Sequence, residues 1–212
     1  MTKYAECEKW VLKDLTNLDR IIPVCRDKSA CVQAGGNIGL FPERLRSYFK
    51  AVHTFEPQDD MFRAMEERMT QLRTSNVIMH KGALGEKEGR IQAELKMKPD
   101  KHEGTYHIEP AVGNWITVVS VDSLELKSCG LIYLDIEGYE PLALKGAEKT
   151  IKRCRPVIAC EVNGNCHRLL GVSNNAIREQ IMSYGYRRVG RRRSDDLFTP
   201  EEWGTITVEG FT

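Results

Sequence analysis

The clearest indication of the fold is the segment Ala30-Cys31-Val32-Gln33-Ala34-Gly35-Gly36-Asn37-Ile38-Gly39. Its first five residues form a short, largely apolar run, which predicts a buried strand over 30–34. The glycines that follow predict a tight turn, and the apolar spacing beyond them predicts a helix near 40–50. This order favours an α/β sheet in which the helix N-terminus faces a ligand. A tight turn without any ligand is the alternative.

Outward from this turn, short apolar runs alternate with amphipathic stretches, as in βαβ units on a mostly parallel sheet. The predicted strands cover 30–34, 52–56, 77–80, 131–135 and 156–161, with late strands near 186–190 and 205–209. The predicted helices cover 40–50, the stretch through Met61, Met65 and Met69, 142–152 and 173–184. The three methionines are interpreted as core residues, because methionine often fills gaps in a core.

Residues 86–120 interrupt this rhythm. The alternation over 89–95 and 115–119 predicts the two strands of an inserted β-hairpin. The polar stretch between them, with its prolines and glycines, predicts a mobile loop over 96–114. Such a loop either covers a binding site or is a tip without a role.

The length of 212 residues predicts a single domain over 1–212. Residues 1–29 form an N-terminal helical extension, with an apolar stripe of Trp10, Val11, Leu12, Leu15 and Leu18. Hydrophobic residues make up 41% and charged residues 29%, which excludes a disordered or fibrous chain. A formal net charge of +1 names no partner. The oligomeric state is left open.

The sequence shows neither a membrane-spanning segment nor a signal peptide. No run approaches the ~20 apolar residues of a membrane span, and the start lacks the apolar core of a signal peptide. We therefore expect a cytoplasmic protein. Seven scattered cysteines fit this compartment, and we expect them to be reduced.

Glu56 strengthens the case for a nucleoside ligand. It ends the second predicted strand, 21 residues after Gly35. In Rossmann-type sheets an acid about 20 residues after the glycine turn binds ribose hydroxyls. Dinucleotide enzymes use G-x-G-x-x-G, whereas here the spacing is Gly35-x-x-x-Gly39. This spacing resembles the first motif of class I methyltransferases, and a nicotinamide-dependent oxidoreductase is the rival hypothesis.

Further segments resemble the FkbM family of methyltransferases over roughly residues 30–200. They are Phe55-Glu56-Pro57, Gly82-Ala83-Leu84-Gly85, Val121-Asp122-Ser123-Leu124, Ile132 to Glu140, Leu144-Lys145-Gly146-Ala147, Arg155 to Ile158 with Glu161, Gly185-Tyr186 and Asp196-Leu197-Phe198. The D-x-E-G-x-E stretch from Asp135 to Glu140, with the K-G-A that follows it, is the most specific part. The resemblance implies a Rossmann-like class I methyltransferase fold: a mostly parallel seven-stranded sheet with helices on both faces. It also implies S-adenosylmethionine as cofactor.

The resemblance also implies which residues bind that cofactor. The glycine loop, with Ala34, Gly35, Gly36, Asn37 and Gly39, would hold the methionine end of S-adenosylmethionine. Glu56, followed by Pro57, would bind the ribose, and Gly82, Ala83 and Leu84 would lie beside the adenine. Asp135 would face the cofactor from the end of its strand. The family usually has an acid where this chain has Gln33, which can still hydrogen-bond the cofactor's ammonium but without charge assistance.

The activity implied is methyl transfer to a hydroxyl of a carbohydrate or another small metabolite. A hydroxyl acceptor benefits from a general base. Glu137, Glu161 and His167 are candidates, because they follow strand ends where open α/β sheets bind ligands. The alternative for Glu137 is a charge at a helix N-terminus, and for His167 an ordinary loop histidine. The alternative functions are methylation of nucleic acid or protein, and cofactor binding without catalysis.

We favour no metal site. Cys154, Cys160, Cys166 and His167 lack the paired spacing of zinc ligands. Asp135, Glu161 and Asn163 offer oxygen ligands for Mg²⁺, but the match to metal-dependent O-methyltransferases is loose. A basic run is formed by Arg187, Arg188, Arg191, Arg192 and Arg193. It is interpreted as a solvated face, with contact to an anionic acceptor as the alternative.

Overall fold

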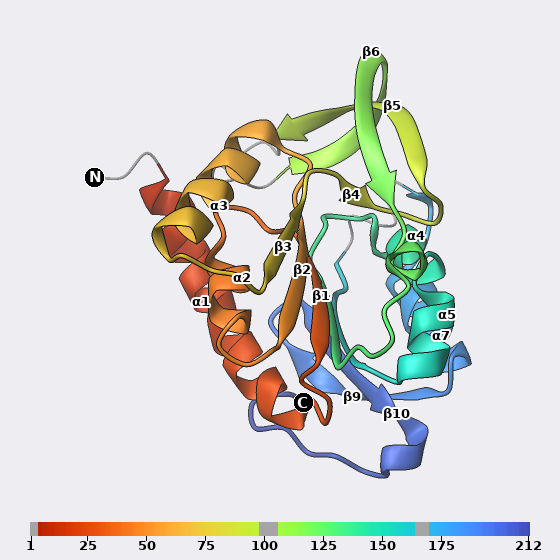
Figure 1. The fold of residues 1–212 in the computed structure, drawn as a ribbon. Helices are drawn as coiled ribbons and strands as arrows, with labels where there is room; N and C mark the ends of the chain where they lie inside the picture. The colour runs from red at the N-terminus through yellow and green to blue at the C-terminus, as the bar shows by residue number, and fades with distance from the viewer. Residues whose placement is uncertain (1–3, 98–105, 164–169) are drawn as a thin grey trace.

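A central sheet organises the computed structural model, which describes residues 4–97, 106–163 and 170–212. The sheet has seven strands in the order β3-β2-β1-β7-β8-β10-β9 (Figure 1). These strands are β3 (Val77–His80), β2 (Ala51–Phe55), β1 (Ala30–Ala34), β7 (Leu131–Leu134), β8 (Val157–Glu161), β10 (Asp195–Pro200) and β9 (Tyr186–Arg192). The first five pair in parallel, and β10 runs antiparallel to both of its neighbours. The predicted mostly parallel, seven-stranded sheet is confirmed.

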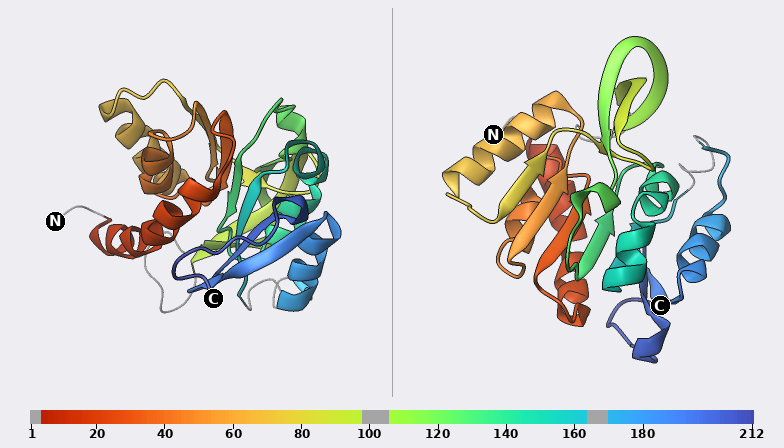
Figure 2. Two further views of the ribbon diagram at one scale, coloured as in Figure 1. Left: turned by 90° about the horizontal axis from the view of Figure 1, so that it is seen from below. Right: turned by 45° about the vertical axis from the view of Figure 1, so that its right-hand side comes forward.

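Helices cover both faces of this sheet (Figure 2). They are α1 (Ala5–Ile21), α2 (Leu40–Leu45), α3 (Asp59–Gln71), α4 (Glu140–Lys145), α5 (Glu148–Cys154) and α7 (Asn174–Ser183), with short 3₁₀ turns at Ile22–Val24, Asp122–Leu124 and Glu201–Trp203. Alternate strand residues enter opposite cores, as the two-residue period of a strand requires. Cys31 and Tyr133 pack with α1 and α2 on one face, whereas Val32 and Ile132 pack with α4, α5 and α7 on the other.

Helix α1 packs on the domain as predicted, and three of the five residues of the predicted stripe, Val11, Leu15 and Leu18, are buried. Cys7, Val11, Leu15, Leu18 and Ile21 are buried in the core of that face. Trp10 and Leu12, which the sequence placed in the stripe, are 43% and 51% exposed. The buried positions follow the three-to-four residue spacing of one helix face, and Trp10 and Leu12 fall outside it.

The insertion and the short strand before it form a second, three-stranded sheet in the order β4-β6-β5, made of β4 (Ala83–Leu84), β5 (Gly89–Met97) and β6 (Tyr106–Val119). The hairpin is confirmed, but the loop predicted over 96–114 is wrong at both ends. β5 continues to residue 97 and β6 begins at residue 106. Residues 111–114 of β6 have no partner residue in the register of β5, because Gln92 pairs with Trp115 and the next residue, Ala93, pairs with Pro110. Residues 98–105 lie outside the described residues.

Two other predicted elements differ. The helix expected over 142–152 is two short helices, α4 and α5, separated at Gly146-Ala147, and the helix near 40–50 ends at Leu45. The late strand expected at 205–209 is wrong, because the partner of β9 is β10 at Asp195–Pro200. Among the helices that the structure describes, none combines the length and the apolar character needed to cross a membrane.

Candidate active site at the ends of β1, β2 and β7

The candidate site lies where the strand order changes direction. β1 has β2 on one side and β7 on the other, so chain connections leave this point toward opposite edges of the sheet. Open α/β sheets bind ligands in the crevice at the carboxyl ends of such strands. The glycine loop follows β1, Glu56 follows β2 and Asp135 follows β7, so the sequence-predicted residues gather at this crevice.

The glycine loop approaches β7 closely. Gly35 has a left-handed φ of 88°, and a Cβ placed on it would lie 2.1 Å from the carbonyl oxygen of Asp135. Gly39 has φ 89°, and Asn37 adopts φ 48°, a conformation that asparagine tolerates better than most residues. The backbone N–H groups of Gly35 and Gly36 both donate to the Phe55 carbonyl. The loop is therefore fixed to β2 and leaves no room for a side chain beside β7.

Gln33 supports this loop from inside the sheet. Its side chain is buried, its Nε2 donates to the Gly35 carbonyl at 2.8 Å, and its Oε1 accepts from the Thr54 hydroxyl at 2.6 Å. Both ends of the amide are used within the protein. The structure thus gives Gln33 a role in shaping the loop, whereas the resemblance implied a hydrogen bond to the cofactor's ammonium.

The carboxylate of Glu56 is buried and oriented by the backbone. Its Oε2 accepts from the N–H of Asn37 at 2.8 Å, and its Oε1 accepts from the N–H of Gln58 at 2.9 Å. Burial raises the pKa of Glu56 to about 7, although the two N–H groups partly offset this effect. A ribose that donates two hydroxyl groups would stabilise the ionised form of this carboxylate.

A cavity that opens to solvent joins these elements, with about 530 Å³ of empty space when the open solvent at its mouth is included. Eight of the sequence-predicted cofactor residues line it: Ala34, Gly35, Glu56, Pro57, Gly82, Ala83, Leu84 and Asp135. Gln33, Gly36, Asn37 and Gly39 are not among its lining residues. A Cβ on Gly36 would meet Met65 and Thr54, and one on Gly39 would meet Met65 and Arg68, so these two glycines face the packing of α3 and β2.

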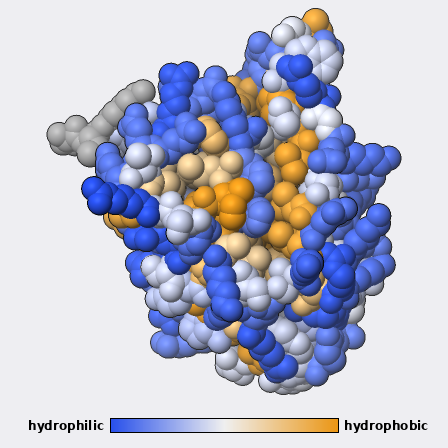
Figure 3. All heavy atoms as spheres, in the orientation of Figure 1, coloured by the Kyte–Doolittle hydropathy of each residue, from blue (hydrophilic) through white to orange (hydrophobic). Residues whose placement is uncertain are grey.

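Sequence reasoning missed the wall that the hairpin builds. Besides Phe55, Ile136 and Tyr139, the cavity is lined by Leu95 from β5 and by Tyr106 and Ile108 from β6. Leu95 pairs with Ile108 across the hairpin, and Ile108 packs with Ala83 in a small apolar cluster. Figure 3 shows apolar surface gathered below the hairpin within a mostly hydrophilic exterior. The alternation of apolar and polar residues predicts the strands of the hairpin, but it does not indicate which face of the hairpin covers the site.

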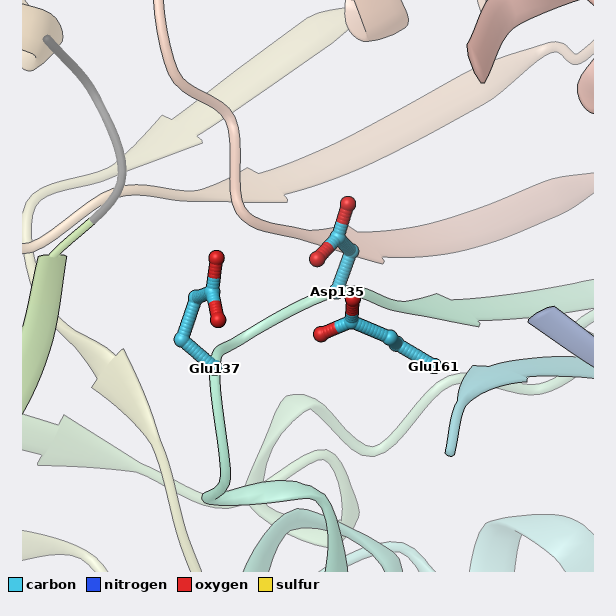
Figure 4. A group of neighbouring side chains, drawn as sticks. All are labelled: Asp135, Glu137 and Glu161. Carbon is cyan, nitrogen blue, oxygen red and sulfur yellow. The ribbon is translucent and has the colours of Figure 1, made fainter. Parts of the chain in front are cut away.

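Three carboxylates meet beside this cavity. Asp135 and Glu137 follow β7, Glu161 ends β8, and oxygens of all three lie within 4.8 Å of one another (Figure 4). Burial first, and then the charges of Glu161 and Glu137, raise the pKa of Asp135 well above its ordinary value. Glu137 has a left-handed φ of 58°, which is costly for glutamate and typical of functional sites. His167, the third candidate base, lies outside the described residues.

Glu140, and not Glu137, is the acid at the N-terminus of α4. It is 1% exposed, and its carboxylate accepts from the backbone N–H groups of Ile136 and Gly138, both at 2.9 Å. Glu140 also stands in the first turn of α4, where a negative charge is favourable. The turn that presents Glu137 is therefore held by a different acid, and Glu137 lines the cavity.

Four of the five arginines of the basic run make contacts within the protein. Arg188 and Arg178 bind the buried carboxylate of Asp196, at 2.9 Å and 2.6 Å. Arg191 donates to the carbonyl of Val162, Arg192 donates to Asn17 of α1, and Arg193 pairs with Asp14. These contacts connect β9, β10 and the turn between them to neighbouring elements.

Comparisons with known proteins agree with this geometry. Residues 33–188 match the family model of the methyltransferase FkbM domain. A methyltransferase FkbM structure from Methylobacillus flagellatus KT superposes with a TM-score of 0.61 at 19% identity, over 82% of this chain and 43% of that one. An rRNA methylase from Streptococcus thermophilus superposes at 0.53 with 13% identity, over 86% and 92%. The chain thus spans less than half of the Methylobacillus protein. Comparison with curated proteins gives no match.

Proposed function

Since the chain belongs to the FkbM family of S-adenosylmethionine-dependent methyltransferases, we propose that it methylates a hydroxyl group of a carbohydrate or another small metabolite. The observation that carries the proposal is one cavity that is lined by residues from both predicted sets. Glu56 and Gly35, assigned to the cofactor, line the same cavity as Glu137, assigned to the acceptor. A donor and an acceptor bound there would be neighbours, and bringing them together is the main task of a methyltransferase.

The residues present fit S-adenosylmethionine. Glu56 offers ribose hydroxyls an oriented carboxylate, and Asp135 offers the methionine ammonium a half-buried one. Gly35 lets the end of β1 pass close to β7 beside the cavity, and Gly82, Ala83 and Leu84 with Pro57 would supply the walls for the adenine. When bound, this cofactor supplies an electrophilic methyl group on a sulfonium.

Glu137 is the base we assign. It lines the cavity two residues beyond Asp135, and its left-handed backbone places it past the end of the strand. Its carboxylate would accept the proton that the acceptor hydroxyl loses as its oxygen is methylated. Glu161, whose carboxylate lies in the same cluster, is the second candidate, and His167 is the third. The proposal includes no metal ion.

Charge in the cavity supports an acceptor that is not an anion. Among the described lining residues there are three carboxylates, Glu56, Asp135 and Glu137, and no lysine, arginine or histidine. A phosphate on the acceptor would meet no cationic side chain among these described residues, so its charge would be left without a protein partner. Tyr106, Tyr139 and Leu95 instead offer the acceptor aromatic and apolar surface. These features favour a neutral hydroxyl compound over a phosphorylated sugar or a nucleic-acid backbone.

A screen of labelled methyl transfer tests the proposal. The protein is incubated with labelled S-adenosylmethionine and with sugars, small hydroxylated metabolites, lipids, nucleic acids or proteins, each with the Glu137→Gln variant beside it. We expect transfer to a small hydroxyl compound that the variant slows strongly. Transfer to nucleic acid alone, abolished by charge reversal of Arg191 to Arg193, would contradict the proposed acceptor class. Cofactor binding without transfer to any acceptor would support a binding protein.

A further inference from the structure

Helix α1 contacts the glycine loop through Cys7. The thiol of Cys7 is wholly buried and donates to Oδ1 of Asn37, with 2.9 Å between sulfur and oxygen. The same Oδ1 accepts from the backbone N–H of Ile38 at 2.7 Å. The side chain of Asn37 is therefore held from both sides, in a residue whose φ of 48° belongs to the left-handed region.

Asn37 in turn helps to orient the carboxylate of Glu56. Its backbone N–H donates to Oε2 of Glu56 at 2.8 Å, on the side of the loop nearest β2. Asn37 itself does not line the cavity, whereas Glu56 does. A change in the left-handed turn at Asn37 would move the N–H and with it the carboxylate that faces the cavity.

Arg68 of α3 holds the next residue of the loop. Its Nε donates to the carbonyl of Ile38 at 3.0 Å, and its two terminal nitrogens reach Glu43 of α2 at 2.8 Å and Glu8 of α1 at 3.3 Å. A guanidinium has donors in a fixed planar arrangement, so it can tie three elements to one backbone position. The loop is thereby fastened to α1, α2 and α3 together.

We propose that α1 is a positioning element of the cofactor site, although it lies outside residues 33–188 that match the family model. Cys7 and Arg68 hold Asn37 and Ile38 in place, and Asn37 then orients the Glu56 carboxylate for the ribose. Cys7 and Arg68 are positioning residues that need not touch the ligand. The inference rests on the proposed ribose-binding role of Glu56.

Calorimetric titration with S-adenosylhomocysteine tests this inference without any acceptor. We expect Cys7→Ala to weaken binding about three- to tenfold, as for the loss of one hydrogen bond. Cys7→Ser keeps a donor and should bind within about twofold of the unmodified protein. Arg68→Gln should weaken binding by about tenfold. Arg44→Gln is the matched control, because it removes an ion pair from α2 to Asp19 of α1 without contacting the loop.

A double-mutant cycle shows whether the effect passes through Glu56. In a Glu56→Gln background, Cys7→Ala should change the affinity by less than about twofold, because the carboxylate it helps to orient is gone. Asn37→Gly keeps the left-handed backbone but removes the oxygen that accepts from the thiol. In that background too, Cys7→Ala should leave the affinity for S-adenosylhomocysteine unchanged. Melting temperatures identify any variant that has merely lost its fold.

The outcomes separate the inference from the proposed function. If the unmodified protein does not bind S-adenosylhomocysteine, or if Glu56→Gln leaves binding unchanged, the assignment of the site is wrong. If Glu56→Gln weakens binding but Cys7→Ala and Arg68→Gln do not exceed the Arg44→Gln control, α1 has no positioning role. Additive effects of Cys7→Ala and Glu56→Gln would equally overturn the route through Asn37.

Discussion

The backbone of Gly35 lies against the carbonyl oxygen of Asp135, so closely that a Cβ on Gly35 would stand 2.1 Å from it. This contact joins the ends of β1 and β7 at the point where the strand order reverses. Because both residues line the cavity, the spacing of the two strand ends also sets the width of the site at that point. The contact explains why glycine is required there, since any side chain would push the strand ends apart.

Gly35→Ala should therefore abolish cofactor binding. The substitution would introduce the clash with Asp135 at a φ of 88° that alanine rarely adopts. We expect S-adenosylhomocysteine affinity to fall by at least about a hundredfold, with a clear loss of melting temperature. Gly204→Ala is the control for the backbone strain alone, because Gly204 has φ 74° and nothing within 4 Å of a Cβ. Equal behaviour of the two variants would contradict the steric explanation.

Asp135→Asn should weaken cofactor binding and stabilise the protein without ligand. The ionised carboxylate is disfavoured by burial and by Glu161 and Glu137, and only a bound cation would compensate it. We expect an affinity loss of about 1–3 kcal/mol by calorimetry, together with a higher melting temperature of the ligand-free form. An unchanged affinity would show that Asp135 does not meet the methionine ammonium.

Glu137→Gln should leave cofactor affinity unchanged but slow a single turnover by about 10²-fold or more, the usual effect of losing a general base. Glu140→Gln is the contrasting variant, because Glu140 holds the turn through Ile136 and Gly138. It should lower the melting temperature. Full activity of Glu137→Gln would move the base assignment to Glu161 or His167, or remove the need for a base.

Cofactor affinity should rise with pH through about 7. The pKa of Glu56 is raised to about 7 by burial, so below that value the carboxylate is protonated and cannot accept from both ribose hydroxyls. Affinity should fall by up to about tenfold for each pH unit below 7. The same shift means that the native state holds a proton which the unfolded state has released. The contribution of Glu56 to the stability of the ligand-free protein is therefore lost as pH rises from about 4.5 to about 7.

Titration calorimetry across pH 6 to 8 checks this prediction, with Glu56→Gln as the comparison. The variant should bind weakly and show a flatter pH profile, to which Asp135 still contributes. A profile as steep as that of the unmodified protein would assign the whole pH dependence to Asp135.

The hairpin should act on the acceptor through its cavity wall. Tyr106 of β6 lines the cavity, so Tyr106→Ala should lower kcat/KM for the acceptor by about tenfold, because a loosely held acceptor is poorly aligned. Val112→Ala on the same strand is the control, since Val112 is 93% exposed. Steady-state kinetics on both variants decide the matter. Unchanged kinetics in Tyr106→Ala would leave the hairpin a structural cover only.

The sequence was informative wherever a short apolar run ended in a residue with special chemistry. For this reason the sequence predicted three strands with their functional residues: β1 with Gly35, β2 with Glu56 and β7 with Asp135. It also predicted that these residues meet at the carboxyl ends of the strands. β10 was hidden because it begins with Asp195-Asp196, whose charges suggest a loop. In the structure Asp196 is buried by ion pairs with Arg178 and Arg188, which lie at other points of the chain.

The details missed within the site depend on tertiary contacts. Nothing in the local sequence indicates that the amide of Gln33 is used by Thr54 and Gly35, or that Glu140 rather than Glu137 holds the turn. The same is true of Leu95, because the alternation of a hairpin does not say which of its faces meets the crevice. Each of these roles is decided by what packs opposite the residue.

A crystal structure of the protein with S-adenosylhomocysteine would show where the cofactor binds and which residues hold it. We predict that the ligand occupies the cavity between β1, β2 and β7, with its ribose hydroxyls on Glu56 and its ammonium on Asp135. The sulfur should face the side of the cavity that Glu137 lines. A ligand bound elsewhere, or one whose ribose and ammonium contact neither Glu56 nor Asp135, would contradict this account.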